Sequence, residues 1–141
     1  MINIKNIASG DTLPPFEREG TFQHWNRFAG ANYEFAGHHM DDDVGRHEGF
    51  GAAIGMAPLI QAYLHSMLRN WAGEDGARVA NVDMQLRSPF LRGRRLIASG
   101  RVKEVREVGG EWRIELEVWA DDDQGTRLVS GSAVVAMPRA E

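Results

Sequence analysis

The chain has 141 residues, a formal net charge of −4, 43% hydrophobic and 26% charged residues, and no cysteine. This length and composition are typical of one globular domain with its own core. The negative charge argues against a surface that coats nucleic acid, and without cysteine there are no disulfides and no thiolate chemistry. The first residues are too polar for a signal peptide, and no run is long and apolar enough for a membrane span. We therefore expect a soluble, cytoplasmic protein.

The N-terminal third is expected to hold an arm, a helix and a loop. Residues 1–20 include Pro14-Pro15, which interrupts regular structure and leaves at most a short strand or an extended arm. Thr21 is a candidate N-cap for a helix that Gly37 would end. Residues 40–53 are rich in Asp, Gly and charge, which is typical of an irregular functional loop.

The clearest predicted helix follows this loop. Pro58 suits its first turn, where a missing N–H has no consequence, and Gly73 provides a stop. Between them, apolar residues recur at intervals of three and four and form one stripe: Ile60, Leu64, Met67, Leu68 and Trp71.

The second half alternates between apolar and polar residues, as β-strands do. The pattern predicts strands over 79–86, 95–108, 112–120 and 128–137, with a tight hairpin at Gly109-Gly110. We interpret the four strands as an antiparallel meander. The apolar face of the helix must be buried, and a curved antiparallel sheet wrapped around it gives an α+β architecture of the hotdog type. The whole chain would form this one domain, and its half-wrapped helix favours a dimer.

One short segment stands out chemically. Glu34 lies five residues before His39, on either side of a predicted bend. A carboxylate and an imidazole held together in this way can position a water molecule and move a proton. The neighbouring His38 is the obvious competitor for the imidazole role.

The order and spacing of several residues resemble the MaoC-like single-hotdog family of (R)-specific enoyl-CoA hydratases and 3-hydroxyacyl dehydratases. The segment Phe28-Ala29-Gly30-Ala31 leads into Glu34 at the position of the family's Asp, and His39 and Asp41 follow in its frame. Phe50 and Ile54 then fall in the frame of the segment that opens the central helix. Further on, Pro89 and Gly93 match the family's turn between strands, and residues 131–138 are similar to its last strand. The resemblance covers about 22–138.

The sequence departs from the family pattern at three places. Glu34 replaces an Asp, Ala36-Gly37 replaces Asn-Pro, and the segment 56–58 replaces His-Gly-Met. We expect the fold to be maintained despite these changes, whereas the catalytic activity is more sensitive to them.

The resemblance implies a role for each matching residue. Glu34 and His39 would hold the water that adds to a 2-enoyl thioester, and the N–H of Ala57, or of Gly55 as an alternative, would bind the thioester oxygen. Substrate-binding positions would be Tyr33, His38, Asp41, Phe50 and Ile54.

The arginines at 92, 94 and 95 form a basic cluster beside a predicted turn. Arg92, Arg94 and Arg95 would either meet the phosphates of coenzyme A or form a solvated turn. No cofactor or metal is implied. The expected partners are an acyl thioester of coenzyme A or of acyl carrier protein and a second subunit, in a homodimer, a dimer of dimers or a heteromer.

Two other functions fit the same fold. A hotdog thioesterase commonly has a carboxylate on its central helix, but residues 58–71 contain no Asp or Glu and offer only Gln61. The third candidate is a non-catalytic subunit that binds an acyl thioester or completes a heteromeric hydratase, since a fold alone does not determine function.

Overall fold

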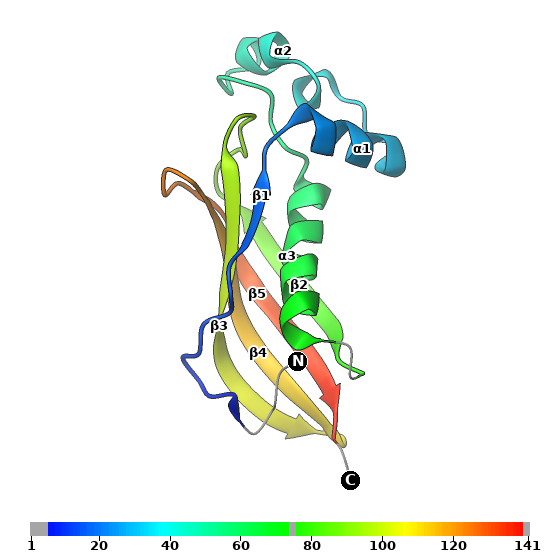
Figure 1. Ribbon diagram of the computed structural model, residues 1–141, viewed down its shortest axis with the longest axis vertical. Helices are drawn as coiled ribbons and strands as arrows, with labels where there is room; N and C mark the ends of the chain where they lie inside the picture. The colour runs from blue at the N-terminus through cyan, green and yellow to red at the C-terminus, as the bar shows by residue number, and fades with distance from the viewer. Residues whose placement is uncertain (1–5, 74–75, 140–141) are drawn as a thin grey trace.

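The computed structural model describes residues 6–73 and 76–139 and confirms the predicted α+β hotdog architecture. One five-stranded antiparallel sheet curls around one long helix (Figure 1). The elements in chain order are β1 (Phe16–Glu19), α1 (Phe22–Asn32), the 3-10 helix η2 (Gly37–His39), α2 (Asp42–His47), α3 (Ala57–Ala72), β2 (Arg78–Leu86), β3 (Arg95–Val108), β4 (Glu111–Asp122) and β5 (Arg127–Pro138).

Helix α3 is the centre of the core, as the apolar stripe predicts. Pro58 lies in its first turn, and the cap at Gly73 has a φ of 78°. The side chains that face the sheet are buried: Leu59, Ile60, Tyr63, Leu64, Met67, Leu68 and Ala72. Trp71 is partly buried at the edge of the same cluster.

The sheet confirms the predicted strands and the hairpin at Gly109-Gly110, whose φ angles of 60° and 80° suit glycine. Strand β4 alternates as expected, and four of its residues lie in the core: Ile114, Leu116, Val118 and Ala120.

The predicted meander is wrong for β2. The strand order is β1-β3-β4-β5-β2, so β2 pairs with β5 rather than with β3. Strand β1 occupies the edge of β3 that a meander would give to β2. The connection between β2 and β3 therefore crosses from one side of the sheet to the other.

Two local predictions also need correction. Helix α1 ends at Asn32 rather than near Gly37, because Tyr33 adopts a left-handed conformation with φ 58°. The expected irregular loop over 40–53 contains helix α2, which the side chain of Asp41 caps by accepting hydrogen bonds from Asp43 and Val44. Asp and Asn favour this cap position, so the acidic run starts a helix.

The three short helices α1, η2 and α2 gather beyond the N-terminal end of α3 (Figure 1). Trp25 of α1 and Phe90 of the β2–β3 connection are both fully buried, and their rings meet edge to face at 5.6 Å. This aromatic contact holds α1 against the β2–β3 connection. Residues 33–56, which link α1 to α3, therefore cross the N-terminal end of α3.

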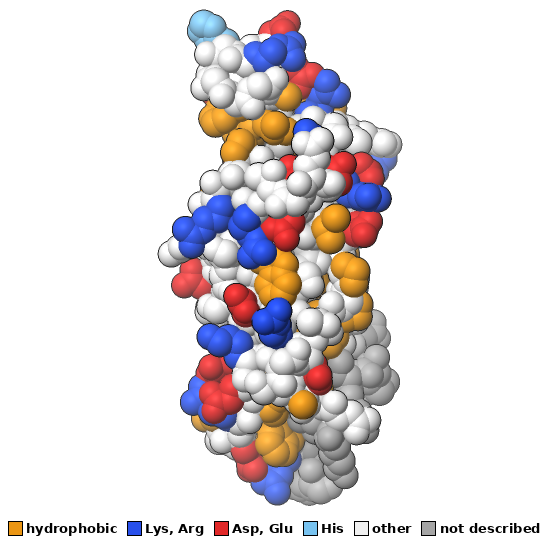
Figure 2. All heavy atoms as spheres, turned by 90° about the vertical axis from the view of Figure 1, so that its left-hand side faces the viewer, with side chains coloured by type: hydrophobic (Ala, Val, Ile, Leu, Met, Phe, Trp, Pro, Cys, Tyr) orange, Lys and Arg blue, Asp and Glu red, His pale blue; other side chains and the backbone are white. Residues whose placement is uncertain are grey.

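Opposite charges are interspersed on the face that Figure 2 shows, where Lys and Arg side chains lie beside Asp and Glu. The ion pairs on the sheet include Arg78–Glu111 at 2.7 Å and Arg127–Asp121 at 2.5 Å. None of the helices in the described part of the chain is long and apolar enough to cross a membrane.

A matched pair of leucine substitutions tests the core. Leu64 of α3 is fully buried, whereas Leu86 of β2 is 55% exposed. We expect Leu64→Ala to lower the free energy of unfolding by about 2–5 kcal/mol, because it leaves a cavity under the sheet. Leu86→Ala should lower it by less than about 1 kcal/mol. Urea unfolding of both variants measures the difference, and equal losses would contradict this description of the core.

Candidate active site

The end of α1 positions the Glu34 carboxylate. Thr21 caps the start of the helix by accepting a hydrogen bond from the N–H of His24, and the left-handed Tyr33 turns the chain back at its end. The N–H of Glu34 then donates to the carbonyl of Ala29 at 3.1 Å. The side-chain amide of Asn32 donates to Glu34 Oε2 at 3.0 Å, which orients the carboxylate.

His39 is held by the segment that precedes α3. Its side chain is the one polar side chain that is buried within the described residues. His39 Nδ1 lies 2.8 Å from the carbonyl oxygen of Ile54. A carbonyl only accepts hydrogen bonds, so Nδ1 must carry the proton. In the neutral form of the ring, Nε2 then presents its lone pair on the other side.

Glu34 and His39 meet across a short gap. Glu34 Oε1 lies 3.6 Å from His39 Nε2, which is too long for a direct hydrogen bond. Both atoms are acceptors when the imidazole is neutral and the carboxylate is ionised. A water that donates one hydrogen to each of them, or a proton on Nε2, satisfies both atoms. The pair that the sequence predicts is thus brought together in a geometry suited to holding and deprotonating water.

His38 faces a different carboxylate. Its Nδ1 lies 2.8 Å from Glu48 Oε2, and its ring packs edge to face against that of His39 with centroids 4.3 Å apart. This geometry favours His39 over His38 as the partner of Glu34. Within residues 6–73 and 76–139, no group of three His, Asp or Glu side chains is placed to hold a metal ion.

The two predicted oxyanion donors differ in their bonding. Ala57 is the first residue of α3, so its N–H has no partner inside the helix and lies at the positive end of the helix dipole. The N–H of Gly55 instead donates to the carbonyl of Phe90 at 2.7 Å. The proposed alternative donor is therefore already bonded in this structure, and only Ala57 keeps that role as a prediction.

An apolar cavity of about 270 Å³ lies beside the Ile54 segment. Phe50 and Ile54, both predicted to bind substrate, line it. Glu34 and His39 do not line it, but the carbonyl of Ile54 is bonded to His39, so its wall adjoins the pair. The lining also includes residues that the sequence did not predict to bind substrate: Ile60, Leu86, Arg87, Ser88 and Phe90.

Two other predicted substrate-binding residues have different surroundings. Tyr33 is 88% exposed, and its ring lies 5.5 Å from that of Phe35. Asp41 caps α2 with its side chain, a structural role that the family frame alone does not indicate.

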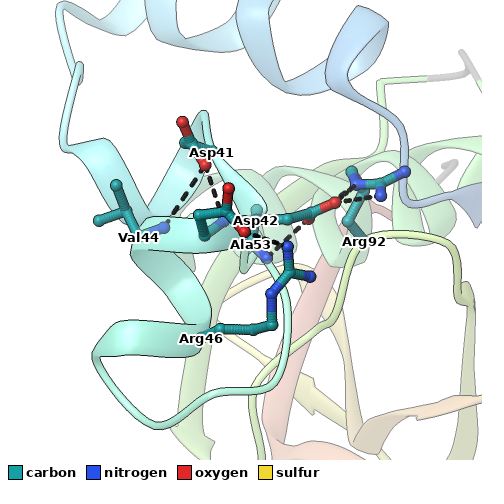
Figure 3. A network of polar contacts seen from close by, with 7 residues as sticks. Asp41, Asp42, Val44, Arg46, Ala53 and Arg92 are labelled. Atoms are coloured by element: carbon teal, nitrogen blue, oxygen red, sulfur yellow. Dashed lines mark hydrogen bonds and ion pairs between the residues drawn. The ribbon is translucent and has the colours of Figure 1, made fainter.

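Two of the three arginines in the basic cluster form ion pairs with carboxylates. Arg92 donates from Nε to both carboxylate oxygens of Asp42 at 2.8 Å (Figure 3). Arg95 lies 3.4 Å from Glu17. Arg94 is anchored through its backbone, because its carbonyl accepts a hydrogen bond from the N–H of Gly20 at 2.7 Å. Of the three arginines predicted to bind phosphate, Arg92 is thus already committed to a carboxylate.

The Asp42–Arg92 ion pair also fixes the protonation state of Asp42. The hydrogen bond from Arg92 and that from the N–H of Ala53 lower the pKa of Asp42 from 3.8 to about 2. The carboxylate is therefore ionised at every pH at which the protein would normally work.

Sequence reasoning missed Asn32, Glu48 and the Asp42–Arg92 pair. Asn32 is two residues from Glu34, and a short amide so close to a candidate carboxylate is a usable signal. Asp42 and Arg92 are 50 positions apart, so no local pattern connects them.

Comparison with known proteins supports the fold. No family model and no curated protein matches the sequence. Among solved structures, an (R)-hydratase of A. caviae involved in PHA biosynthesis superposes with a TM-score of 0.85 at 19% identity, over 95% of this chain and 99% of that one. A MaoC-like dehydratase of Rhodospirillum rubrum gives 0.85 at 16% identity, over 100% and 99%. The ChsH1-ChsH2 complex of Mycobacterium tuberculosis gives 0.81 at 21% identity, over 92% and 98%. The predicted resemblance to the MaoC-like hotdog fold is confirmed, and at these identities the similarity establishes the fold alone.

The lowered pKa of Asp42 predicts a pH-dependent contribution to stability. Because the folded-state pKa lies near 2, below its usual 3.8, the ion pair stabilises the fold fully above about pH 4 and loses its effect as the pH falls through about 2. Asp42→Asn should therefore unfold more easily than the wild type at pH 6, and the difference should shrink towards pH 3. Urea unfolding at several pH values measures this, and a difference that is constant over that range would contradict it.

Proposed function

We propose that the chain is a hydro-lyase that adds water to a 2-enoyl thioester, or removes it from a 3-hydroxyacyl thioester. The observation that carries this proposal is the gap of 3.6 Å between Glu34 Oε1 and His39 Nε2. Each group is oriented by another residue, Glu34 by Asn32 and His39 by the carbonyl of Ile54. This arrangement suits a water molecule held between a base and an imidazole.

The proposed reaction uses these positions. Glu34 and His39 together accept a proton as the oxygen of the bound water forms a bond to C3 of the substrate. The π electrons of the C2–C3 double bond move towards the thioester, whose oxygen becomes negative. The pair then returns a proton to C2, which restores the thioester. Because the two groups are coupled, the proton belongs to the pair rather than to either residue.

The negative oxygen needs a donor near the reacting carbons. We assign this role to the N–H of Ala57, which is unpaired within α3 and aligned with the helix dipole. Pro58 has no N–H, which leaves Ala57 as the first available donor of the helix. The cavity lined by Phe50 and Ile54 would receive the acyl chain, and Arg94 and Arg95 remain candidates for the phosphates of coenzyme A.

The solved structures agree with this proposal at the level of the fold. One is described as an (R)-hydratase and another as a two-component complex. By analogy we expect this chain to act as a dimer, with itself or with a related subunit. The substrate would be an acyl thioester of coenzyme A or of acyl carrier protein.

Incubation of the pure protein with crotonyl-CoA and with longer or branched 2-enoyl-CoA substrates tests the proposal. The absorbance of the enoyl thioester and the release of free thiol are followed together. Loss of the enoyl band without thiol release is the expected result. Thiol release would instead indicate a thioesterase, although α3 carries no Asp or Glu. No reaction with any substrate would favour a non-catalytic subunit.

Two substitutions test the roles of the pair. Glu34→Gln and His39→Ala should each lower kcat by at least about 10²-fold, because each removes one half of the acid–base pair. Glu48→Gln provides the control, because it alters a carboxylate of the same segment that pairs with His38 rather than with the proposed water. Its kcat should stay within about 3-fold of the wild type, and His38→Ala is measured beside it as the competing imidazole.

Full activity in either Glu34→Gln or His39→Ala would remove that residue from the mechanism. A large loss in His38→Ala with little loss in His39→Ala would move the imidazole role to His38.

A further inference from the structure

We propose that the Asp42–Arg92 ion pair is a positioning device that holds His39 at its working distance from Glu34. The inference rests on the proposed function for its kinetic part, and its structural part is independent of the reaction. It assigns Arg92 a role in the site without contact with the substrate, in place of the two alternatives that the sequence left open, binding of coenzyme A phosphate or a solvated turn.

The two residues of the ion pair also bond both backbone polar groups of one buried residue, Ala53, Asp42 through its side chain and Arg92 through its backbone. Asp42 Oδ1 accepts the N–H of Ala53 at 3.0 Å, and the backbone N–H of Arg92 donates to the carbonyl of Ala53 at 2.8 Å. The Arg92 guanidinium in turn donates to both oxygens of Asp42 (Figure 3). Ala53 has no exposed surface, so its two backbone groups depend on these partners.

The next residue transmits this position to the imidazole. Ile54 donates its N–H to the carbonyl of His38 at 2.9 Å and accepts the Nδ1–H of His39 at 2.8 Å. A displacement of Ala53 therefore moves the carbonyl that determines the orientation of the His39 ring. Helix α2 packs closely against the residues just before Ala53 and limits their movement. A Cβ on Gly45 of this helix would lie only 2.1 Å from the carbonyl oxygen of Ala52.

Arg92 also contacts α1, the helix that ends just before Glu34. The guanidinium of Arg92 lies 4.9 Å from the centre of the Phe22 ring, at the first residue of α1. Arg92 thus touches α1, α2 and the segment before α3. Helix α1 leads directly to Glu34, and the segment before α3 contains Ile54, whose carbonyl bonds to His39.

The burial of the pair separates it from the other surface ion pairs. The side chain of Asp42 is 17% exposed and that of Arg92 is 39% exposed. Among the ion pairs of the described residues, these are the lowest values for a carboxylate and for an arginine. The Arg46–Asp43 pair of the same helix is 53% and 86% exposed. A partly buried, two-pronged contact holds geometry better than a solvated one.

The test compares Arg92→Met with Arg92→Lys and with the control Arg46→Met. Arg92→Met removes the ion pair, Arg92→Lys keeps the charge but not the two-pronged contact, and Arg46→Met removes the exposed neighbouring pair. Three quantities are measured for each full-length variant: the free energy of unfolding, kcat and KM for 2-enoyl-CoA hydration, and the ¹⁵N shifts of the His39 ring. Loss of the signal in His39→Ala assigns these shifts.

We expect Arg92→Met to lower kcat by about 10–10²-fold and to change KM by less than about 3-fold, since a misplaced acid–base group affects the reaction more than binding. In the same variant, the ¹⁵N shifts should show the form protonated at Nε2 beside the Nδ1-protonated form of the wild type. Arg92→Lys should fall between Arg92→Met and the wild type in both kcat and ¹⁵N shifts. Arg46→Met should have the wild-type kcat within about 2-fold.

A folded Arg92→Met protein with the wild-type kcat and a His39 ring protonated only at Nδ1 would overturn the proposal. If that variant does not fold, Arg92→Lys decides in the same way, by a reduced kcat and a mixed protonation pattern or by their absence. If the wild type hydrates no enoyl thioester, the proposed function fails, and the ¹⁵N shifts alone still confirm or overturn the positioning role.

Discussion

The burial of α3 inside the curled sheet is the constraint on which the rest of the structure depends. An apolar helix face as long as that of α3 is unfavourable in water, and one flat sheet would cover only part of it. The strands bend at register shifts between Val79 and Asn81, between Val102 and Glu104 and between Ala120 and Asp121. Such bulges increase the curvature and twist of a sheet. With the apolar face of α3 covered in this way, its N-terminal end is left for α1, η2 and α2 to cross (Figure 1).

The polar groups at that end are arranged mainly by the backbone. The peptide groups of the segment 53–55 bond to residues of three other parts of the chain: Asp42, His38, His39, Phe90 and Arg92. A buried backbone group that loses its partner is costly, so these bonds resist small displacements. The imidazole of His39 is thereby oriented by a feature that substitution of a single side chain in the segment would not easily remove.

Sequence patterns predicted the parts of the fold that depend on local periodicity. The stripe of α3, the alternation in β4 and the glycine pair between β3 and β4 were each visible over a few residues. The position of β2 was not, because it depends on β1 occupying the far edge of β3, nearly 80 residues earlier in the chain. The site shows the same division. The spacing of Glu34 and His39 indicated the pair, whereas the bond from Gly55 to Phe90 and the contact of Asp42 with Arg92 join distant segments and needed the folded chain.

The hydrogen bond from His39 to Ile54 has a consequence for the stereochemistry of the proposed reaction. Because Nδ1 is committed to a carbonyl, the ring cannot pass a proton through to its far side and exchanges protons only at Nε2. That nitrogen faces the same gap as the Glu34 carboxylate. The hydroxyl group and the hydrogen would then both arrive from one side of the double bond, so the proposed mechanism corresponds to syn addition.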